Sequence, residues 1–202
     1  MSAAPETTES LNLTHHFLIA MPGMQDELFG RSVVYVCEHN DKGALGLIIN
    51  KPSDISMDKL FDKVDLLLRR EDLHTTPVFH GGPVHTERGF VLHDRVVLDD
   101  SAGDESAYAS SLNIPGGLEM TTSREVLEAL STGAGPKRVL VSLGYASWSE
   151  GQLESEITEN SWLTVSADAS VIFETPVEQR YDSALALLGV QPWALSAAAG
   201  RA

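Results

Sequence analysis

Two apolar, β-branched runs joined by a short polar loop constrain the fold of this chain more than any other stretch. The segment at 32–50 reads SVVYVCEHNDKGALGLIIN, and its loop at 39–43 supplies turn formers and a glycine. Runs of this kind on both sides of a glycine-containing loop predict a β-hairpin. Both arms are apolar at nearly every position, so we expect other elements to cover both faces of the sheet.

Helix-start signals mark the segments that follow this hairpin. Ser56 is a good N-cap and stands between apolar residues at the spacing of a hydrophobic staple, so a helix is expected to begin there. Three further segments have the pattern of a capping box, at 122–125, 149–152 and 175–178. Between the first two, RVLVSLGYASW at 138–148 is a continuous apolar run, which predicts a central buried strand.

The order of the expected elements favours an α+β fold. Short strands are expected at 78–80, 89–93, 112–114 and 118–120, ahead of most of the helices. Strands early and helices late are typical of α+β proteins rather than of a doubly wound parallel sheet.

The length of 202 residues favours one domain with loose ends. Residues 1–12 are small, polar and acidic, and they are expected to form a disordered leader. Small residues dominate 193–202, which we interpret as a flexible tail. Residues 13–192 then form the single domain.

The charge of the chain argues against a nucleic-acid partner. The formal net charge is −15 and the isoelectric point is near 4.7. Basic residues are scattered, and Arg69-Arg70 and Lys137-Arg138 are the only adjacent basic pairs. Affinity for DNA depends on cations that neutralise phosphates, so direct binding to nucleic acid or to an anionic membrane is disfavoured. An acidic surface could instead meet a basic protein partner.

Three further features favour a cytoplasmic protein. No apolar run is long enough to span a bilayer. The first residues, MSAAPETTES, have neither the basic flank nor the apolar core of a secretory signal. The one cysteine, Cys37, lies in an apolar run and is expected to be a buried structural thiol in a reducing compartment.

The segment FHGGPVHTERGF at 79–90 offers two interpretations. Bare backbone N–H groups at Gly81 and Gly82 could cradle an anion, with Arg88 adding positive charge. Alternatively, the glycines serve a tight turn, and Pro83 removes one donor from any anion cradle. The turn is the favoured interpretation.

The histidines raise the question of a metal site. All seven fall between positions 15 and 93, and His80, His85 and His93 lie close in sequence. A metal needs three or four converging ligands, and the HExxH and CxxC patterns are absent. We therefore expect neither a metal nor a cofactor.

Tyr145 and Trp148 follow the predicted buried strand and precede a helix start. Junctions of this kind often house ligands, because amphipathic aromatic rings meet free backbone donors there. The alternative is that both rings cap the core, and the sequence leaves both interpretations open.

Five segments together resemble the bacterial YqgE/AlgH family. They are HFLIAMPGMQDELFGRSVVYVCEHNDKGALGLIINKP, GGPVHTERGFVLH, TTSREVLEAL, LVSLGYASWSEGQLESEI and NSWL, in order, from about residue 15 to 191. The resemblance implies an α+β fold in which a bent, mixed sheet, largely antiparallel, forms a pseudo-barrel with helices packed outside. For activity it implies a regulator of transcription, and it supplies no agreed catalytic residues.

Two functional hypotheses follow. The favoured one is a non-enzymatic cytoplasmic protein that influences transcription indirectly, through an unknown protein partner or a small ligand. The alternative is an enzyme or ligand sensor with its site between the GGPV loop and the GYASW junction. The candidate ligand-binding residues are Asn50, His80, Gly81, Gly82, Arg88, Tyr145 and Trp148.

Overall fold

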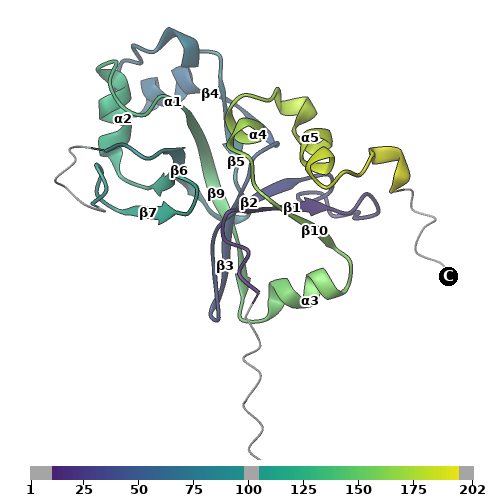
Figure 1. Cartoon of the computed structure of the whole chain (residues 1–202). Helices are drawn as coiled ribbons and strands as arrows, with labels where there is room; N and C mark the ends of the chain where they lie inside the picture. The colour runs from purple at the N-terminus through teal and green to yellow at the C-terminus, as the bar shows by residue number, and fades with distance from the viewer. Residues whose placement is uncertain (1–10, 98–104, 196–202) are drawn as a thin grey trace, which may run out of the picture.

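The structure is a computed structural model that describes residues 11–97 and 105–195 (Figure 1). Its strands join one curled sheet, in the order β10-β1-β2-β3-β9-β6-β8-β7, with β5 attached to β9 and β4 attached to β5. The strands are β1 (His16–Ala20), β2 (Val33–Asn40), β3 (Gly43–Ile48), β4 (Pro52–Ser56), β5 (Pro77–His80), β6 (Val84–Asp94), β7 (Ser111–Ile114), β8 (Leu118–Thr121), β9 (Val139–Ser149) and β10 (Trp162–Ser166).

Strand β9 is the branch point of the sheet and runs through the middle of the molecule (Figure 1). Its last residues pair antiparallel with β3, and most of its length pairs antiparallel with β6. On the edge opposite β6, β9 also pairs parallel with β5 through Ser142 and Leu143. The predicted central buried strand is confirmed, and three neighbours share it.

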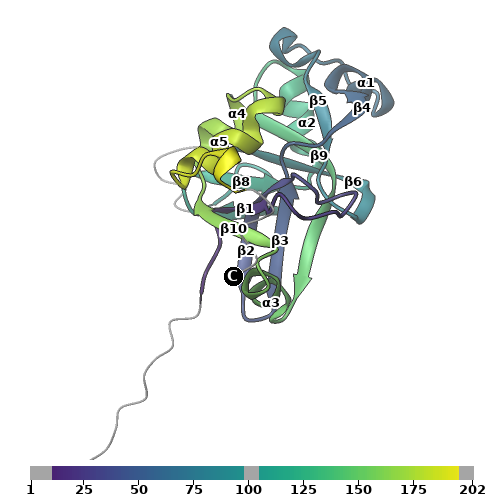
Figure 2. The same cartoon turned by 90° about the vertical axis from the view of Figure 1, so that its right-hand side faces the viewer.

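Helices pack around the outside of the curled sheet, which confirms the α+β pseudo-barrel (Figures 1 and 2). The helices α1 and α2 lie together at one end of β9, and α3 lies near its other end. Helix α5 lies beside β1, β2 and β10, and α4 lies beside α5 and β9. The α-helices are α1 (Met57–Lys63), α2 (Arg124–Ser131), α3 (Gln152–Thr158), α4 (Ala169–Phe173) and α5 (Arg180–Leu187), and the 3-10 helices are η1 (Glu71–Leu73), η2 (Val177–Gln179) and η3 (Pro192–Ala194).

The hairpin of β2 and β3 is buried on both faces, as its sequence predicts. Val33, Tyr35 and Cys37 point into the core cluster beneath α4 and α5. Val34 and Val36 point the opposite way, into a cluster that α3 covers. Successive side chains of a strand point to opposite faces, so an all-apolar strand needs a partner layer on each side.

Local capping signals predict most helix starts to within a few residues of their positions in the structure. Ser56 caps α1 as predicted, and its hydroxyl accepts a hydrogen bond from the Lys59 backbone N–H. In the 122–125 segment the cap is Ser123 rather than the first residue, with its hydroxyl bonded to the Glu125 N–H. The 175–178 segment begins the short helix η2 instead of α5, so α5 starts at Arg180.

The ends of the chain fall largely outside the described residues. Positions 1–10 of the predicted leader and 196–202 of the predicted tail belong to this part, so the domain boundaries at 12 and 192 stay predictions. Among the described helices, none has the length and apolar character needed to cross a membrane.

Candidate anion-binding site

The Gly-Gly-Pro segment packs backbone to backbone across β9. The Gly81 N–H donates to the Leu143 carbonyl, and the Gly81 carbonyl accepts from the Ile48 N–H, both at 2.9 Å. A methyl carbon at Gly81 would lie 2.2 Å from the Gly144 carbonyl oxygen. Both polar groups of Gly81 are therefore occupied within the protein.

Gly82 and Gly144 complete this contact, and we call the three residues the glycine crossing. A methyl carbon at Gly82 would lie 2.1 Å from the Tyr145 carbonyl carbon. Gly144 has φ +74°, and a methyl carbon there would lie 2.5 Å from the Gly82 carbonyl oxygen. Close approach of two backbones accounts for the glycines that the sequence presents in GGPV and GYASW.

Asn50 and Trp148 are engaged in holding the fold. The Asn50 side-chain oxygen accepts from the Val33 N–H at 2.8 Å, and its amide group donates to the Arg31 carbonyl at 2.9 Å. The buried Trp148 indole N–H donates to a Glu156 carboxylate oxygen at 2.9 Å.

Tyr145 is half-buried, and its ring lies beside aromatic neighbours while its backbone meets Gly82 in the glycine crossing. Its ring centroid is 5.2 Å from Phe90 and 5.9 Å from His85. His80 and Arg88 are exposed. The structure thus brings Tyr145 to His85 and does not gather the seven candidate residues into one cavity.

Arg180 forms a different candidate site, at the first residue of α5. It is 7% exposed, although arginine is rarely buried without an ionic partner. Its Nε–H donates to the Thr175 carbonyl at 3.0 Å, and an Nη1–H donates to the Ile49 carbonyl. The guanidinium carbon lies 5.0 Å from the centre of the Phe79 ring, a cation–π contact.

The charge of Arg180 has no carboxylate partner among the described residues. None of them forms an ion pair with Arg180, and no acceptor bonds its Nη2 atom within the described ranges. Burial lowers the pKa of Arg180 to about 10, against a smaller opposing effect of the Glu178 charge. A buried cation without a counterion is destabilising, so an anion that reached it would gain a strong interaction.

The guanidinium lines a cavity of about 230 Å³, which we call the Arg180 pocket. The lining residues are Asp72, Leu73, Thr76, Phe79, Lys137, Arg138, Val139, Leu140, Ile172, Phe173 and Arg180. Among the described lining residues Asp72 is the one carboxylate, and Arg70 already binds both of its oxygens, at 2.8 and 2.7 Å. The lining also includes Lys137, so the pocket combines apolar walls with positive charge.

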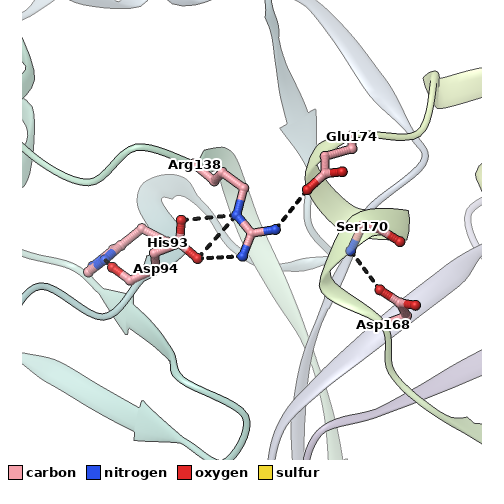
Figure 3. Close-up of polar contacts among 6 residues, drawn as sticks. All are labelled: His93, Asp94, Arg138, Asp168, Ser170 and Glu174. Carbon is pink, nitrogen blue, oxygen red and sulfur yellow. Dashed lines mark hydrogen bonds and ion pairs between the residues drawn. The ribbon is translucent and has the colours of Figure 1, made fainter.

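Arg138 shows the opposite arrangement at the wall of the same pocket (Figure 3). Its guanidinium lies between two carboxylates, with 2.7 Å to Asp94 and 2.9 Å to Glu174. The bonds to Asp94 raise the pKa of Arg138 most, and those to Glu174 add to this. Nearby, the Asp168 carboxylate accepts from the Ser170 N–H at 2.9 Å and caps α4, which fixes this wall.

Sequence reasoning missed Arg180, although one signal was present. The apolar face predicted for this helix consists of Tyr181, Ala184, Leu185 and Leu188. Arg180 lies four residues before Ala184 and therefore on that same face, where a charged residue needs an explanation.

Comparisons with known proteins agree on one family. A family model described as AlgH-like matches residues 17–193. A UPF0301 protein from Delftia acidovorans is 68% identical over 195 residues, which cover 96% of this chain and 98% of that protein. Another UPF0301 protein, from a Polaromonas species, is 70% identical over 192 residues, which cover 95% and 96% of the two chains.

Two solved structures have the same fold. The solution structure of the AlgH protein from Pseudomonas aeruginosa matches with a TM-score of 0.73 and 42% identity, over 100% of both chains. A crystal structure of a protein from Corynebacterium diphtheriae matches with a TM-score of 0.68 and 20% identity, over 91% of this chain and 89% of that one. The chain matches the family model over nearly its whole described length, and it belongs to the AlgH-like family.

Proposed function

We propose that this protein is a non-enzymatic cytoplasmic regulator that binds a small anion in the Arg180 pocket and influences transcription indirectly, through a protein partner. The observation that carries the proposal is the buried side chain of Arg180, which lines a cavity and has no carboxylate partner among the described residues. Ligand sites are concave, partly apolar and supplied with a few fixed polar groups, and the Arg180 pocket fits this description.

The position of Arg180 gives an anion a way to act on the structure. Its guanidinium bonds to the carbonyl of Thr175, just before η2, and to the carbonyl of Ile49, at the end of β3. An anion on Nη2 would therefore bind at the joint between the sheet and the α4–α5 region. A ligand that favours one arrangement of such a joint shifts the population toward it.

Charge supports an indirect rather than a direct effect on transcription. The net charge of −15 disfavours contact with DNA phosphates and suits a basic protein partner. The regulator role itself comes from the family resemblance.

Thermal unfolding in the presence of inorganic phosphate or acetate, at constant ionic strength, tests the proposal. At a concentration one hundred times its dissociation constant, a bound anion adds about 2.7 kcal/mol to the free energy of unfolding. We expect the melting temperature to rise with at least one of these anions in the wild-type protein and not in Arg180→Met.

Arg69→Met is the matched control, because Arg69 is an exposed arginine outside the pocket. It should retain the full rise in melting temperature. An equal rise in all three proteins, or no rise with either anion in the wild-type protein, would contradict the anion site.

A further inference from the structure

A second cavity, independent of the Arg180 pocket, lies between α1 and α2 over the ladder of β6 and β9. Its volume is about 280 Å³, near the lower end of the range for ligand pockets. We call it the apolar groove. Its lining residues are Leu60, Val64, Glu87, Gly89, Val91, Thr122, Ser123, Arg124, Leu127, Val141 and Leu143.

Apolar side chains form the base and the walls of the groove. Val91 and Val141 are buried, at 4% and 3% exposure, and form the base. Leu60, Leu127 and Leu143 are half-buried and pack against the same core cluster from the sides. Water in such a groove makes few hydrogen bonds, so an apolar molecule that displaces it gains free energy.

Gly89 leaves open space in this lining, at the residue where β6 resumes regular pairing with β9 after the irregular stretch that begins at Val84. It lies inside β6 and pairs with Leu143, and its φ is not in the positive region that favours glycine. A methyl carbon at Gly89 would meet no atom within 4 Å, in contrast to those at the glycine crossing. Glycine inside a strand is destabilising relative to alanine, and it often marks a bulge or the close approach of a ligand or another backbone. No other backbone of the described chain makes that approach.

The charged groups at the rim of the groove already have partners. The Arg124 guanidinium bonds to the Glu128 carboxylate at 3.0 Å and to the Val64 carbonyl at 2.8 Å. The Glu87 carboxylate lies 3.3 Å from the His85 ring nitrogen. A charged ligand would lose its hydration without gaining a free counterion, so the groove favours an uncharged molecule.

We propose that the apolar groove binds a small uncharged apolar molecule, and that Gly89 leaves the space which this molecule occupies. The Thr122 and Ser123 residues at the rim allow such a molecule one polar group, and the rest of its surface would contact the valine and leucine side chains.

Titration with 1-naphthol, a neutral aromatic probe of suitable size, tests this inference by methyl NMR. We expect saturable shift changes for the methyl groups of Leu127, Val141 and Leu143. In Gly89→Leu the added side chain should fill the groove and weaken binding at least tenfold, while the protein stays as stable as the wild type. Gly23→Leu is the matched control, because a methyl carbon at Gly23 also meets nothing within 4 Å and Gly23 lies outside the groove.

A second variant keeps the test decisive if Gly89→Leu does not fold. Cys37 is 1% exposed and is the only cysteine in the chain, so Gly89→Cys introduces a single accessible thiol. Bound 1-naphthol should slow the reaction of this thiol with a neutral maleimide several-fold. Unsaturable or absent methyl shifts in the wild-type protein, unchanged binding in Gly89→Leu, or an unprotected thiol would overturn the inference.

Discussion

The glycine crossing and the Arg180 pocket lie next to each other at the end of β5, yet only the crossing has a recognisable motif in the sequence. Phe79 of β5 lies under the Arg180 guanidinium, and two residues later Gly81 begins the crossing over β9. The crossing consists of backbone contacts that exclude side chains, whereas the pocket consists of side chains around a charge that has no ionic partner in the described part of the chain. The sequence motif of the crossing thus reflects a steric requirement, whereas the Arg180 pocket, the better candidate for a ligand site, has no sequence motif.

The difference has a physical origin. A close approach of two backbones restricts single positions to glycine, so glycine residues in the sequence indicate it. The lack of a counterion for Arg180 among the described residues depends on which side chains surround it in space, and those in the pocket lining come from three separate segments, at 72–79, 137–140 and 172–173. In the sequence, His80, Arg88 and Tyr145 near the crossing are of the types that bind ligands. In the structure, His80 and Arg88 lie exposed on the surface.

The largest effect is expected at the crossing, from Gly144→Ala. The methyl group would clash with the Gly82 carbonyl oxygen, and alanine would be strained at φ +74°. Together these effects should lower the free energy of unfolding by about 3 kcal/mol, as measured by urea denaturation. Gly23→Ala, which meets no atoms within 4 Å, should change it by less than about 0.5 kcal/mol. If both variants are equally stable, the crossing is not a steric requirement.

Double-mutant cycles should distinguish Arg138 from Arg180, with energies smaller than the loss of stability expected for Gly144→Ala. A double-mutant cycle with Arg138→Met and Asp94→Asn should give a coupling energy of about 1 kcal/mol, because the pair is bidentate but partly exposed. The matching cycle with Arg180→Met and Glu178→Gln should give a clearly smaller coupling, because Glu178 acts on Arg180 only through its charge and the two side chains do not form an ion pair. A similar coupling in both cycles would mean that Arg180 is already compensated, and the case for an anion would fail.

The smallest expected effect is the contribution of His93 to the pH dependence of stability. His93 precedes Asp94, whose carboxylate binds Arg138 (Figure 3). Burial lowers the pKa of His93 below its ordinary value of 6.5, despite the opposing hydrogen bond to the Asp94 carbonyl. Below pH 6.5 the unfolded state then binds more protons than the folded state, so stability should fall as the pH decreases from 6.5 toward about 5.

His93→Gln should make this decline shallower without abolishing it. Burial also lowers the pKa of His15, which therefore contributes a dependence of the same sign. Denaturation midpoints of both proteins across this pH range provide the measurement. An unchanged slope in the variant would show that His93 does not titrate differently in the two states.

Much of the fold could be predicted from the sequence where local signals were strong. The two-sided burial of β2 and β3, the central position of β9 and the start of α1 at Ser56 all follow from apolar patterns and a capping residue. The pairing of β1 with β10 could not be predicted, because it joins segments about 150 residues apart and has no local signature.

The candidate site was much less predictable than the fold. The sequence makes Asn50 and Trp148 candidate ligand-binding residues, yet the side-chain hydrogen-bonding groups of both bind within the protein. Ligand binding at the seven candidate residues stays a prediction. The sequence offers one signal for Arg180, its place on an apolar helix face, but only the three-dimensional structure shows that no described carboxylate pairs with it.

The central place of β9 has a consequence for how the chain is made. The β2–β3 hairpin leaves the ribosome about 100 residues before the strand that completes its pairing, since Ala44 pairs with Trp148. Until β9 arrives, β3 is an apolar edge strand, of the kind that pairs with other chains and promotes aggregation. Such long-range pairing also slows folding, because a large loop must close before the contacts form. We therefore expect truncations that end before β9 to aggregate rather than to fold as smaller units.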